Sequence, residues 1–354
     1  MNLYHATAFI RHLLTSRSAA GHGVHSPFVF DFLTDVVRGN NDANLISNVE
    51  RLRQEMLADS RNVRVTDLGA GSARRLGEER GISDIASMTA LPPKQVRLLA
   101  RMAHDPRCTR SQATQSRVAG GQRTQGEGLS AQNERSDAVP QKREDSEHTR
   151  SQATQSSVAG GQRTQGEGLS AQNERSDAVP QTERSNVLTF HRTEEEHESY
   201  NSIILELGTS LGISTLALSL AAPEKRVVTV EGCPALAGIA RDNLLRYGAA
   251  NAHVINMEFS EALGMLRHRG TTVSLAFIDG NHRGRALKHY AETIRSLGEE
   301  MLIVADDIHL SHDMHEAWQQ LALSGIAPVT METFRFGILF CLHNITPGHY
   351  RIRY

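Results

Sequence analysis

The chain lacks the features that mark membrane, secreted and nucleic-acid-binding proteins. Three cysteines occur among 354 residues, and Cys108, Cys233 and Cys341 have neither disulfide-framework nor zinc-site spacing. No run approaches the roughly 20 apolar residues that span a bilayer, and the amino terminus lacks the apolar region of a secretion signal. The formal charge of -2 offers no broad basic surface for nucleic acid. We therefore expect a cytoplasmic protein with no membrane or nucleic-acid partner.

Residues 203–222 have the pattern of a buried strand, a glycine turn and a helix in succession. An apolar run ends at Glu206, and Gly208 and Gly212 bracket the turn. Glycine suits such a turn because the backbone adopts positive φ and approaches a ligand closely. The next apolar run ends at Glu231, 23 residues after Gly208 (231 − 208), close to the spacing of roughly 20 for a ribose-binding carboxylate. This order predicts a cofactor site, although a turn without a ligand is the structural alternative.

The details of the turn indicate which cofactor it binds. It lacks the third glycine of dinucleotide-binding enzymes and the Lys-Ser/Thr ending of a P-loop. Its sequence, E-L-G-T-S-L-G-x-S-T, resembles motif I of the class I S-adenosylmethionine-dependent methyltransferases, most closely the catechol and caffeoyl-CoA O-methyltransferases. The resemblance implies that Glu206 and the turn hold the methionine end of the cofactor and that Glu231 holds its ribose. The predicted cofactor-binding residues are Glu206, Gly208, Thr209, Ser210, Gly212, Ser214, Glu231 and Asp279.

The carboxyl-terminal half alternates between strand and helix patterns, as α/β proteins with parallel sheets do. Strands are predicted at residues 203–206, 226–230, 252–256, 273–278 and 301–305, and helices at 234–247, 260–267, 283–297 and 311–323. Two final runs, 328–332 and 336–342, suit an antiparallel pair at the sheet edge. We therefore predict an α/β fold with the Rossmann-like, seven-stranded sheet of class I methyltransferases.

Acidic residues follow two of the later strands, at the edge where open α/β sheets bind ligands. Asp279, Asp306 and Asp307 resemble the Mg²⁺ site of the catechol-type enzymes, although that family commonly has Asn where Asp307 stands. The resemblance implies metal binding by all three and catalytic roles for Asp279 and His282, whose imidazole is a suitable base near neutral pH. Local capping at the strand ends and at the following helix is the alternative for the acids and for His282.

A run of histidines follows the last of these acids. His309, His312 and His315 recur at every third residue, but no cysteine lies nearby and the run crosses from a loop into a helix. Zinc needs a fixed ligand geometry that such a boundary hardly provides. We interpret these side chains as solvated or partly packed histidines.

The amino-terminal part contains a second strand-and-glycine pattern, VRVTDLGAGS, at residues 63–72. A charged segment with further glycines follows it, and no second strand ending in an acid lies at the required distance. We therefore assign no cofactor to Asp67, Gly69 and Gly71. Residues 22–37 and 83–89 resemble the amino-terminal region of a group of uncharacterised bacterial methyltransferases, which implies a helical lid over the substrate side.

Residues 109–141 recur at 149–181 with one difference, Arg117 against Ser157, at a period of 40 residues (149 − 109). Two copies are too few for a solenoid, and this polar composition predicts a disordered insertion in a surface connection, with a flexible tether for a partner as the alternative. Three regions follow: a helical cap at 1–104, the insertion at 105–198 and the S-adenosylmethionine-binding domain at 199–354.

The expected function is O-methyl transfer from S-adenosylmethionine to a small hydroxylated substrate, with Mg²⁺ assistance left open. The alternatives are a metal-independent N- or O-methyltransferase acting on another acceptor and a non-catalytic S-adenosylmethionine-binding protein. The expected partner is a small-molecule substrate, and a homodimer stays open.

Overall fold

The computed structural model describes residues 3–21, 24–66, 78–109 and 202–354, all within one compact unit. The repeats at 109–141 and 149–181 lie outside the described residues, except for Thr109, and so does the DLGAGS segment. In the described part, every helix is too short or too polar to cross a bilayer.

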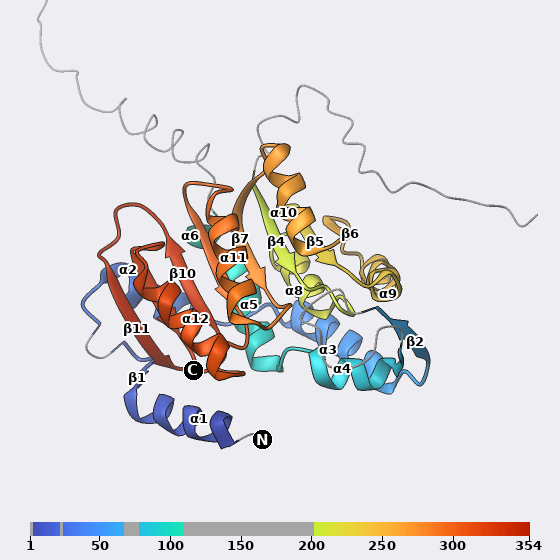
Figure 1. Cartoon of the computed structure of the whole chain (residues 1–354), viewed down its shortest axis with the longest axis horizontal. Coiled ribbons are helices and arrows are strands. Elements are labelled where there is room, and N and C mark those ends of the chain that lie inside the picture. The colour runs from blue at the N-terminus through green and yellow to red at the C-terminus, as the bar shows by residue number, and fades with distance from the viewer. Residues whose placement is uncertain (1–2, 22–23, 67–77, 110–201) are drawn as a thin grey trace, which may run out of the picture. The chain divides into compact units, whose positions relative to one another are not determined.

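Nine strands form one sheet in the order β1-β11-β9-β10-β8-β7-β4-β5-β6 (Figure 1). The bounds of its strands are β1 (Arg17–Ser18), β4 (Ser202–Leu207), β5 (Val227–Glu231), β6 (Ala252–Asn256), β7 (Thr272–Ile278), β8 (Met301–Ala305), β9 (Val329–Glu332), β10 (Gly337–Cys341) and β11 (Gly348–Arg353). The five strands from β6 to β8 are parallel, whereas β10 runs antiparallel between β8 and β9.

The register of the parallel strands sets the position of the site. Leu207 at the end of β4 pairs with Val230 of β5 and Ile278 of β7, and Ile278 pairs with Ala305 of β8. The carboxyl ends of β4, β5, β7 and β8 therefore lie side by side at one edge of the sheet. Because β4 and β8 are buried along their whole length, their sequences are continuous apolar runs rather than alternating ones.

The prediction of seven strands was wrong, because two further strands extend the sheet beyond β9. β11 pairs parallel with β9, and the two residues of β1 pair parallel with β11. The predicted antiparallel pair exists as β9 and β10, but β9 is an interior strand rather than an edge strand. Polar residues alternate along β11, and β1 is too short to give a sequence signal.

Helices cover both faces of the sheet. Their bounds are α1 (Leu3–Thr15), α2 (Pro27–Asp31), the π-helix η1 (Phe32–Val37), α3 (Ala43–Ala58), α4 (Ile82–Thr89), α5 (Pro93–His104), α6 (Pro106–Thr109), α8 (Ile213–Ala221), α9 (Pro234–Arg246), α10 (Phe259–His268), α11 (Gly284–Arg295) and α12 (His312–Leu323). α11 and α12 pack together on one face, and α5 and α6 lie behind the strands on the other (Figure 1). α3 and α5 both pack against α8, so these amino-terminal helices complete the core.

The amino-terminal region also contains strands. β2 (Asn62–Val65) and β3 (Glu78–Gly81) form a separate antiparallel pair, with Val63 opposite Arg80. A cofactor turn of the Rossmann type needs a parallel strand inside the main sheet, which β2 is not. The observed pairing agrees with placing the cofactor at the later glycine turn.

Candidate active site

A cavity of about 680 Å³ opens where β4, β5 and β7 end. Its volume lies within the range of roughly 300–1,000 Å³ that is usual for small-molecule sites. The predicted site residues that line it are Gly208, Thr209, Ser210, Ser214, Glu231, Asp279, His282 and Asp307. The other three predicted residues, Glu206, Gly212 and Asp306, are not part of its wall. Another cavity of about 500 Å³, between α3 and α9, contains none of the predicted residues.

The glycine turn after β4 requires its glycines. Gly208 has a φ of +109°, and a Cβ atom there would lie 2.1 Å from the carbonyl oxygen of Asp279. Gly212 has a φ of +82° and caps α8. Ser210, between them, also has positive φ at 47°, which is uncommon for a residue with a side chain. The turn therefore brings main-chain atoms of Gly208, Ser210 and their neighbours to the cavity wall.

Glu231 is held by the two segments that flank the cavity. Its Oε2 accepts a hydrogen bond from the Ser210 main-chain N–H at 2.8 Å, and its Oε1 accepts one from the Cys233 main-chain N–H at 2.9 Å. This fixed, partly exposed carboxylate suits a ribose.

Glu206 lies beneath the turn rather than in the cavity wall. Its side chain is fully buried, and its Oε2 accepts hydrogen bonds from the hydroxyls of Thr215 and Thr229. The Thr229 hydroxyl lies 2.6 Å from that of Thr209 in the turn. Burial raises the pKa of Glu206, and the hydroxyl donors partly offset this effect. Glu206 thus ties the turn to β5, and its predicted contact with the cofactor stays a prediction.

Asp279 and His282 lie at the opposite side of the cavity. His282 Nε2 is 4.0 Å from Asp279 Oδ1, and the His282 side chain is 32% exposed while that of Asp279 is 12% exposed. Burial, together with the charges of Asp306 and Asp307, holds the pKa of Asp279 well above its usual value. Both side chains line the cavity, and the imidazole is the more exposed of the two, so a substrate hydroxyl can reach it.

An arginine that the sequence analysis did not identify holds the remaining two acids. Arg335 precedes β10, and its Nε and one terminal nitrogen each donate to Asp306 at 2.6 Å, to Oδ1 and Oδ2 respectively. The same guanidinium lies 3.3 Å from Asp307 Oδ1 and forms part of the cavity wall. The Asp306 side chain is fully buried, so its charge needs this partner.

The three carboxylates do not lie close enough together in this structure to form a ready set of metal ligands. Both oxygens of Asp306 accept hydrogen bonds from Arg335, which places a positive charge beside this acid. Among the described residues, Asp279, Asp306 and Asp307 also do not each bring an oxygen within 4.8 Å of the others, whereas a different set of three does. The positive charge between the strand ends is supplied by a guanidinium.

Apolar and polar groups complete the wall. Phe259 packs edge-on against the Tyr290 ring, with 5.8 Å between centroids, and Leu236 lies beyond Glu231. From the amino-terminal region, the Thr89 hydroxyl lies 2.9 Å from that of Ser210. The end of α4 therefore contacts the glycine turn, and its neighbours contribute to the wall. These side chains were not predicted, because only the packed fold brings them to the cavity.

Comparisons with known proteins agree with this geometry. A family model described as a methyltransferase domain matches residues 205–308. No curated protein matches the chain.

Several solved structures resemble part of the chain. Cofactor-bound Rv0187 from MTB is 26% identical, with 39% of this chain and 72% of that chain covered and a TM-score of 0.33. The O-methyltransferase TomG from Streptomyces achromogenes, in complex with SAM, is 21% identical over 40% and 72% of the two chains, with a TM-score of 0.34. An O-methyltransferase from Bacillus cereus in complex with SAH is 21% identical over 39% and 72%, with a TM-score of 0.33. Structural similarities with TM-scores this low support no conclusion beyond the one that the family match supports.

The family match begins in β4, the strand that leads into the glycine turn, and ends just beyond Asp307. It thus includes the turn, Glu231, Asp279 and His282. The strand order around β4 places all of these at one edge of the sheet. Residues 205–308 therefore match a methyltransferase domain, and the fold and the cavity described above lie within or beside this matched segment.

Proposed function

We propose that the protein transfers the methyl group of S-adenosylmethionine to a hydroxyl of a small acceptor. The observation that carries this proposal is the paired geometry of Glu231 and the glycine turn at one side of the cavity, with His282 at the other side. Glu231 would bind the ribose, and the main chain of the turn would bind the methionine end of the cofactor. The apolar wall at Phe259 and Leu236 suits the adenine ring.

Methyl transfer requires a proton acceptor for the hydroxyl, and the hydroxyl oxygen must approach the methyl carbon in line with the bond to sulfur. The acceptor hydroxyl gives its proton to the imidazole of His282 as its oxygen attacks the methyl carbon. The new C–O bond forms as the bond from that carbon to sulfur breaks, and the electron pair stays on sulfur. The sulfonium becomes a neutral thioether, so S-adenosylhomocysteine leaves with no net charge at sulfur. His282 is exposed enough to return its proton to water.

The charge needed near the acceptor is assigned here to Arg335. Its guanidinium forms part of the cavity wall and is anchored by Asp306, so it can donate a hydrogen bond to the partly ionised hydroxyl oxygen without moving. Assistance by Mg²⁺, which the resemblance to catechol-type enzymes implies, is the second candidate. It would require the oxygens of Asp279, Asp306 and Asp307 to come closer together than they are in this structure.

The test is an assay of S-adenosylhomocysteine formation with isotope-labelled methyl donor and a panel of small hydroxylated acceptors. We expect activity that survives chelation by EDTA and that His282→Gln reduces by about 10²–10⁴-fold, the usual contribution of a general base. Lys288→Gln, on the following helix and outside the cavity wall, is the matched control and should keep full activity. Activity that disappears with EDTA and returns only with Mg²⁺ would establish the metal-assisted alternative.

Other outcomes separate the remaining alternatives. Methylation of amines but not hydroxyls would indicate an N-methyltransferase. Binding of S-adenosylmethionine without any product across the acceptor panel would favour a non-catalytic binding protein. Calorimetric titration with S-adenosylmethionine should accompany the assay, because it separates loss of binding from loss of chemistry.

A further inference from the structure

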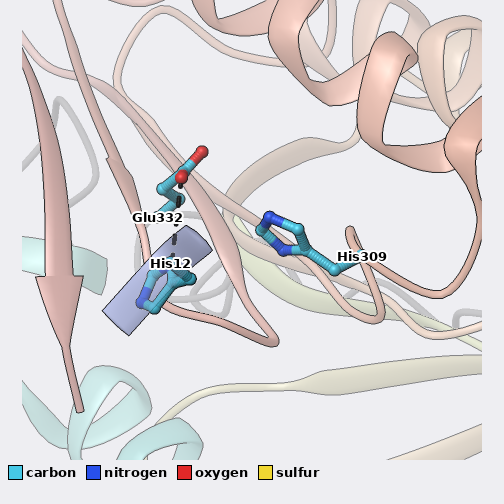
Figure 2. Close-up of side chains that lie close together, drawn as sticks. All are labelled: His12, His309 and Glu332. Atoms are coloured by element: carbon cyan, nitrogen blue, oxygen red, sulfur yellow. Dashed lines mark ion pairs between the residues drawn. The ribbon is translucent and has the colours of Figure 1, made fainter. Parts of the chain in front are cut away.

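Three buried side chains from distant parts of the chain meet away from the active-site cavity. His12 comes from α1, His309 from the turn after β8, and Glu332 from the end of β9 (Figure 2). One nitrogen of each imidazole and one carboxylate oxygen all lie within 4.8 Å of one another. The exposed fractions are 3% for His12, 5% for His309 and 8% for Glu332. None of the three lines the cavity at the glycine turn.

Each imidazole is oriented by a main-chain carbonyl on its far side. His309 Nδ1 lies 2.8 Å from the Phe334 carbonyl oxygen, and His12 Nε2 lies 3.2 Å from that of Ile352. A carbonyl oxygen only accepts, so these ring nitrogens carry the hydrogens. The opposite nitrogens, His309 Nε2 and His12 Nδ1, therefore carry lone pairs. This is the arrangement by which outer hydrogen bonds orient histidine ligands at metal sites.

Among the residues that the structure describes, no donor reaches the lone pair of His12. His12 Nδ1 is buried without a hydrogen-bond partner and lies 4.0 Å from Glu332 Oε1. His315 stacks on His309 with 4.4 Å between ring centroids, and its Nδ1 is also buried and unpartnered. His12 Nδ1 is thus a buried acceptor that a bound cation between the three side chains would satisfy.

The charges around the cluster favour a particular kind of ion. Glu332 accepts a hydrogen bond from Trp318 Nε1 at 2.8 Å and is also paired with Arg351. The Arg351 guanidinium balances the Glu332 charge, so electrostatic attraction alone would not hold a cation here. Mg²⁺ and Ca²⁺ depend on several oxygen ligands, whereas imidazole nitrogens suit Zn²⁺ and its neighbours. The donor set of two nitrogens and one oxygen is therefore a zinc-type set.

We propose that His12, His309 and Glu332 bind one Zn²⁺ ion, which links α1 to the carboxyl-terminal strands. Three protein ligands leave a fourth position for water. The position of the cluster indicates a structural role, because α1 has few other contacts with the sheet apart from those at β11. The sequence analysis treated His309, His312 and His315 as packed or solvated; the structure separates them, since the His312 side chain is 80% exposed.

The test uses the full-length protein, stripped of metal by a chelator and dialysed. Titration with Zn²⁺ alone should give one site per chain and a higher thermal unfolding midpoint. His12→Phe keeps a ring in the packing but removes the ligand nitrogen. We expect it to weaken Zn²⁺ binding by more than the roughly 10–100-fold that loss of an outer hydrogen bond costs. His312→Ala is the matched control and should bind like the unaltered protein.

Two further readouts keep the proposal falsifiable. Co²⁺ added in place of Zn²⁺ should give the visible absorption of a tetrahedral site, and His309→Gln should abolish it. Circular dichroism of the metal-free variants checks that they fold. The proposal is overturned if the unaltered protein takes up no stoichiometric Zn²⁺, or if His12→Phe binds as tightly. S-adenosylmethionine affinity, measured in the same samples, should not change with His12→Phe, so the fate of this site and that of the proposed methyl transfer are distinguishable.

Discussion

Glu231 is the residue on which the proposed cofactor site depends most directly. Both of its carboxylate oxygens are already oriented by main-chain N–H groups, at 2.8 Å and 2.9 Å. We expect Glu231→Ala to weaken S-adenosylmethionine binding by about 10–150-fold, because a hydrogen bond to a charged group contributes about 1.5–3 kcal/mol. Isothermal titration calorimetry measures this directly. Glu224→Ala, at an exposed turn before β5, is the control. Equal affinity of Glu231→Ala and the unaltered protein would remove the basis for the ribose site.

Arg335 gives a prediction that distinguishes a guanidinium from a metal ion. Removing it in Arg335→Ala leaves Asp306 buried without its cation, which should cost up to about 3–5 kcal/mol of unfolding free energy. The same change frees both Asp306 oxygens beside Asp307. We therefore expect millimolar Mg²⁺ to raise the thermal midpoint of the variant but not that of the unaltered protein.

The comparison has a matched control. Arg283→Ala removes another arginine of the cavity wall that does not bond to Asp306, and should gain no response to Mg²⁺. If the unaltered protein is stabilised by Mg²⁺ as strongly as Arg335→Ala is, the assignment of the positive charge to Arg335 is wrong.

The sequence identified site residues that belong to local patterns and missed those that depend on packing. Glu231 and Asp279 follow apolar strands, and the ends of parallel strands meet at one edge, so their proximity could be predicted. Arg335 lies in the connection between β9 and β10, and only the insertion of β10 beside β8 brings it to Asp306. His12 and His309 are separated by most of the sequence, and only the folded chain brings them together. Single-sequence patterns contain no information about such contacts.

At the scale of the elements, the glycine turn can be tested by a graded series of alanine substitutions. Gly208→Ala should be the most damaging, because its Cβ would lie 2.1 Å from a main-chain oxygen at a φ of +109°. At Gly212 a Cβ atom has room, since its nearest neighbour would lie at 3.5 Å. Gly212→Ala should therefore lower the free energy of unfolding by only about 1–2 kcal/mol, the cost of placing alanine in the left-handed backbone region. At Gly238, inside α9, an added Cβ atom would meet no other atom within 4 Å. Gly238→Ala should raise the free energy of unfolding by about 1 kcal/mol, because alanine favours the helix more than glycine does.

Urea unfolding gives the three free energies, and calorimetry gives cofactor affinity for each variant. We expect Gly208→Ala to lose cofactor binding, since the main chain of the turn must shift, while Gly238→Ala keeps it. A Gly208→Ala protein as stable as Gly212→Ala would mean that the turn relaxes freely. That outcome would contradict a rigid turn as the basis of the cofactor site.

The elements of the carboxyl-terminal half were predictable because burial on both faces leaves continuous apolar runs. The predicted strand at 301–305 coincides with β8, and the predicted helices lie within a few residues of α9, α10, α11 and α12. β11 was missed because its side chains are largely half-buried or exposed, so no apolar run marks it. β1 depends on β11 for its pairing and has only two residues. The nine-stranded sheet therefore exceeds what local patterns specify.

At the scale of the whole molecule, the described core can be considered without the repeat segment. α6 ends at Thr109 and contacts β7 and β8, and β4, which begins at Ser202, pairs with β7. The chain thus leaves and re-enters the core beside the same strand. A short linker could join these two points, since ten extended residues span roughly 33 Å.

We expect that replacing residues 112–198 with about ten glycine and serine residues preserves the fold and the cofactor affinity. Loop closure costs about 0.6 kcal/mol less for each halving of length. The connection between Thr109 and Ser202 shortens about sixfold, so the unfolding free energy should rise by about 1.5 kcal/mol. Thermal unfolding and S-adenosylmethionine titration of the shortened and full-length proteins measure both quantities. A scrambled segment of equal length and composition is the control and should behave like the full-length protein. Loss of cofactor binding in both altered proteins would show that the repeat sequence itself acts in the site, which is the result that the composition of this segment argues against.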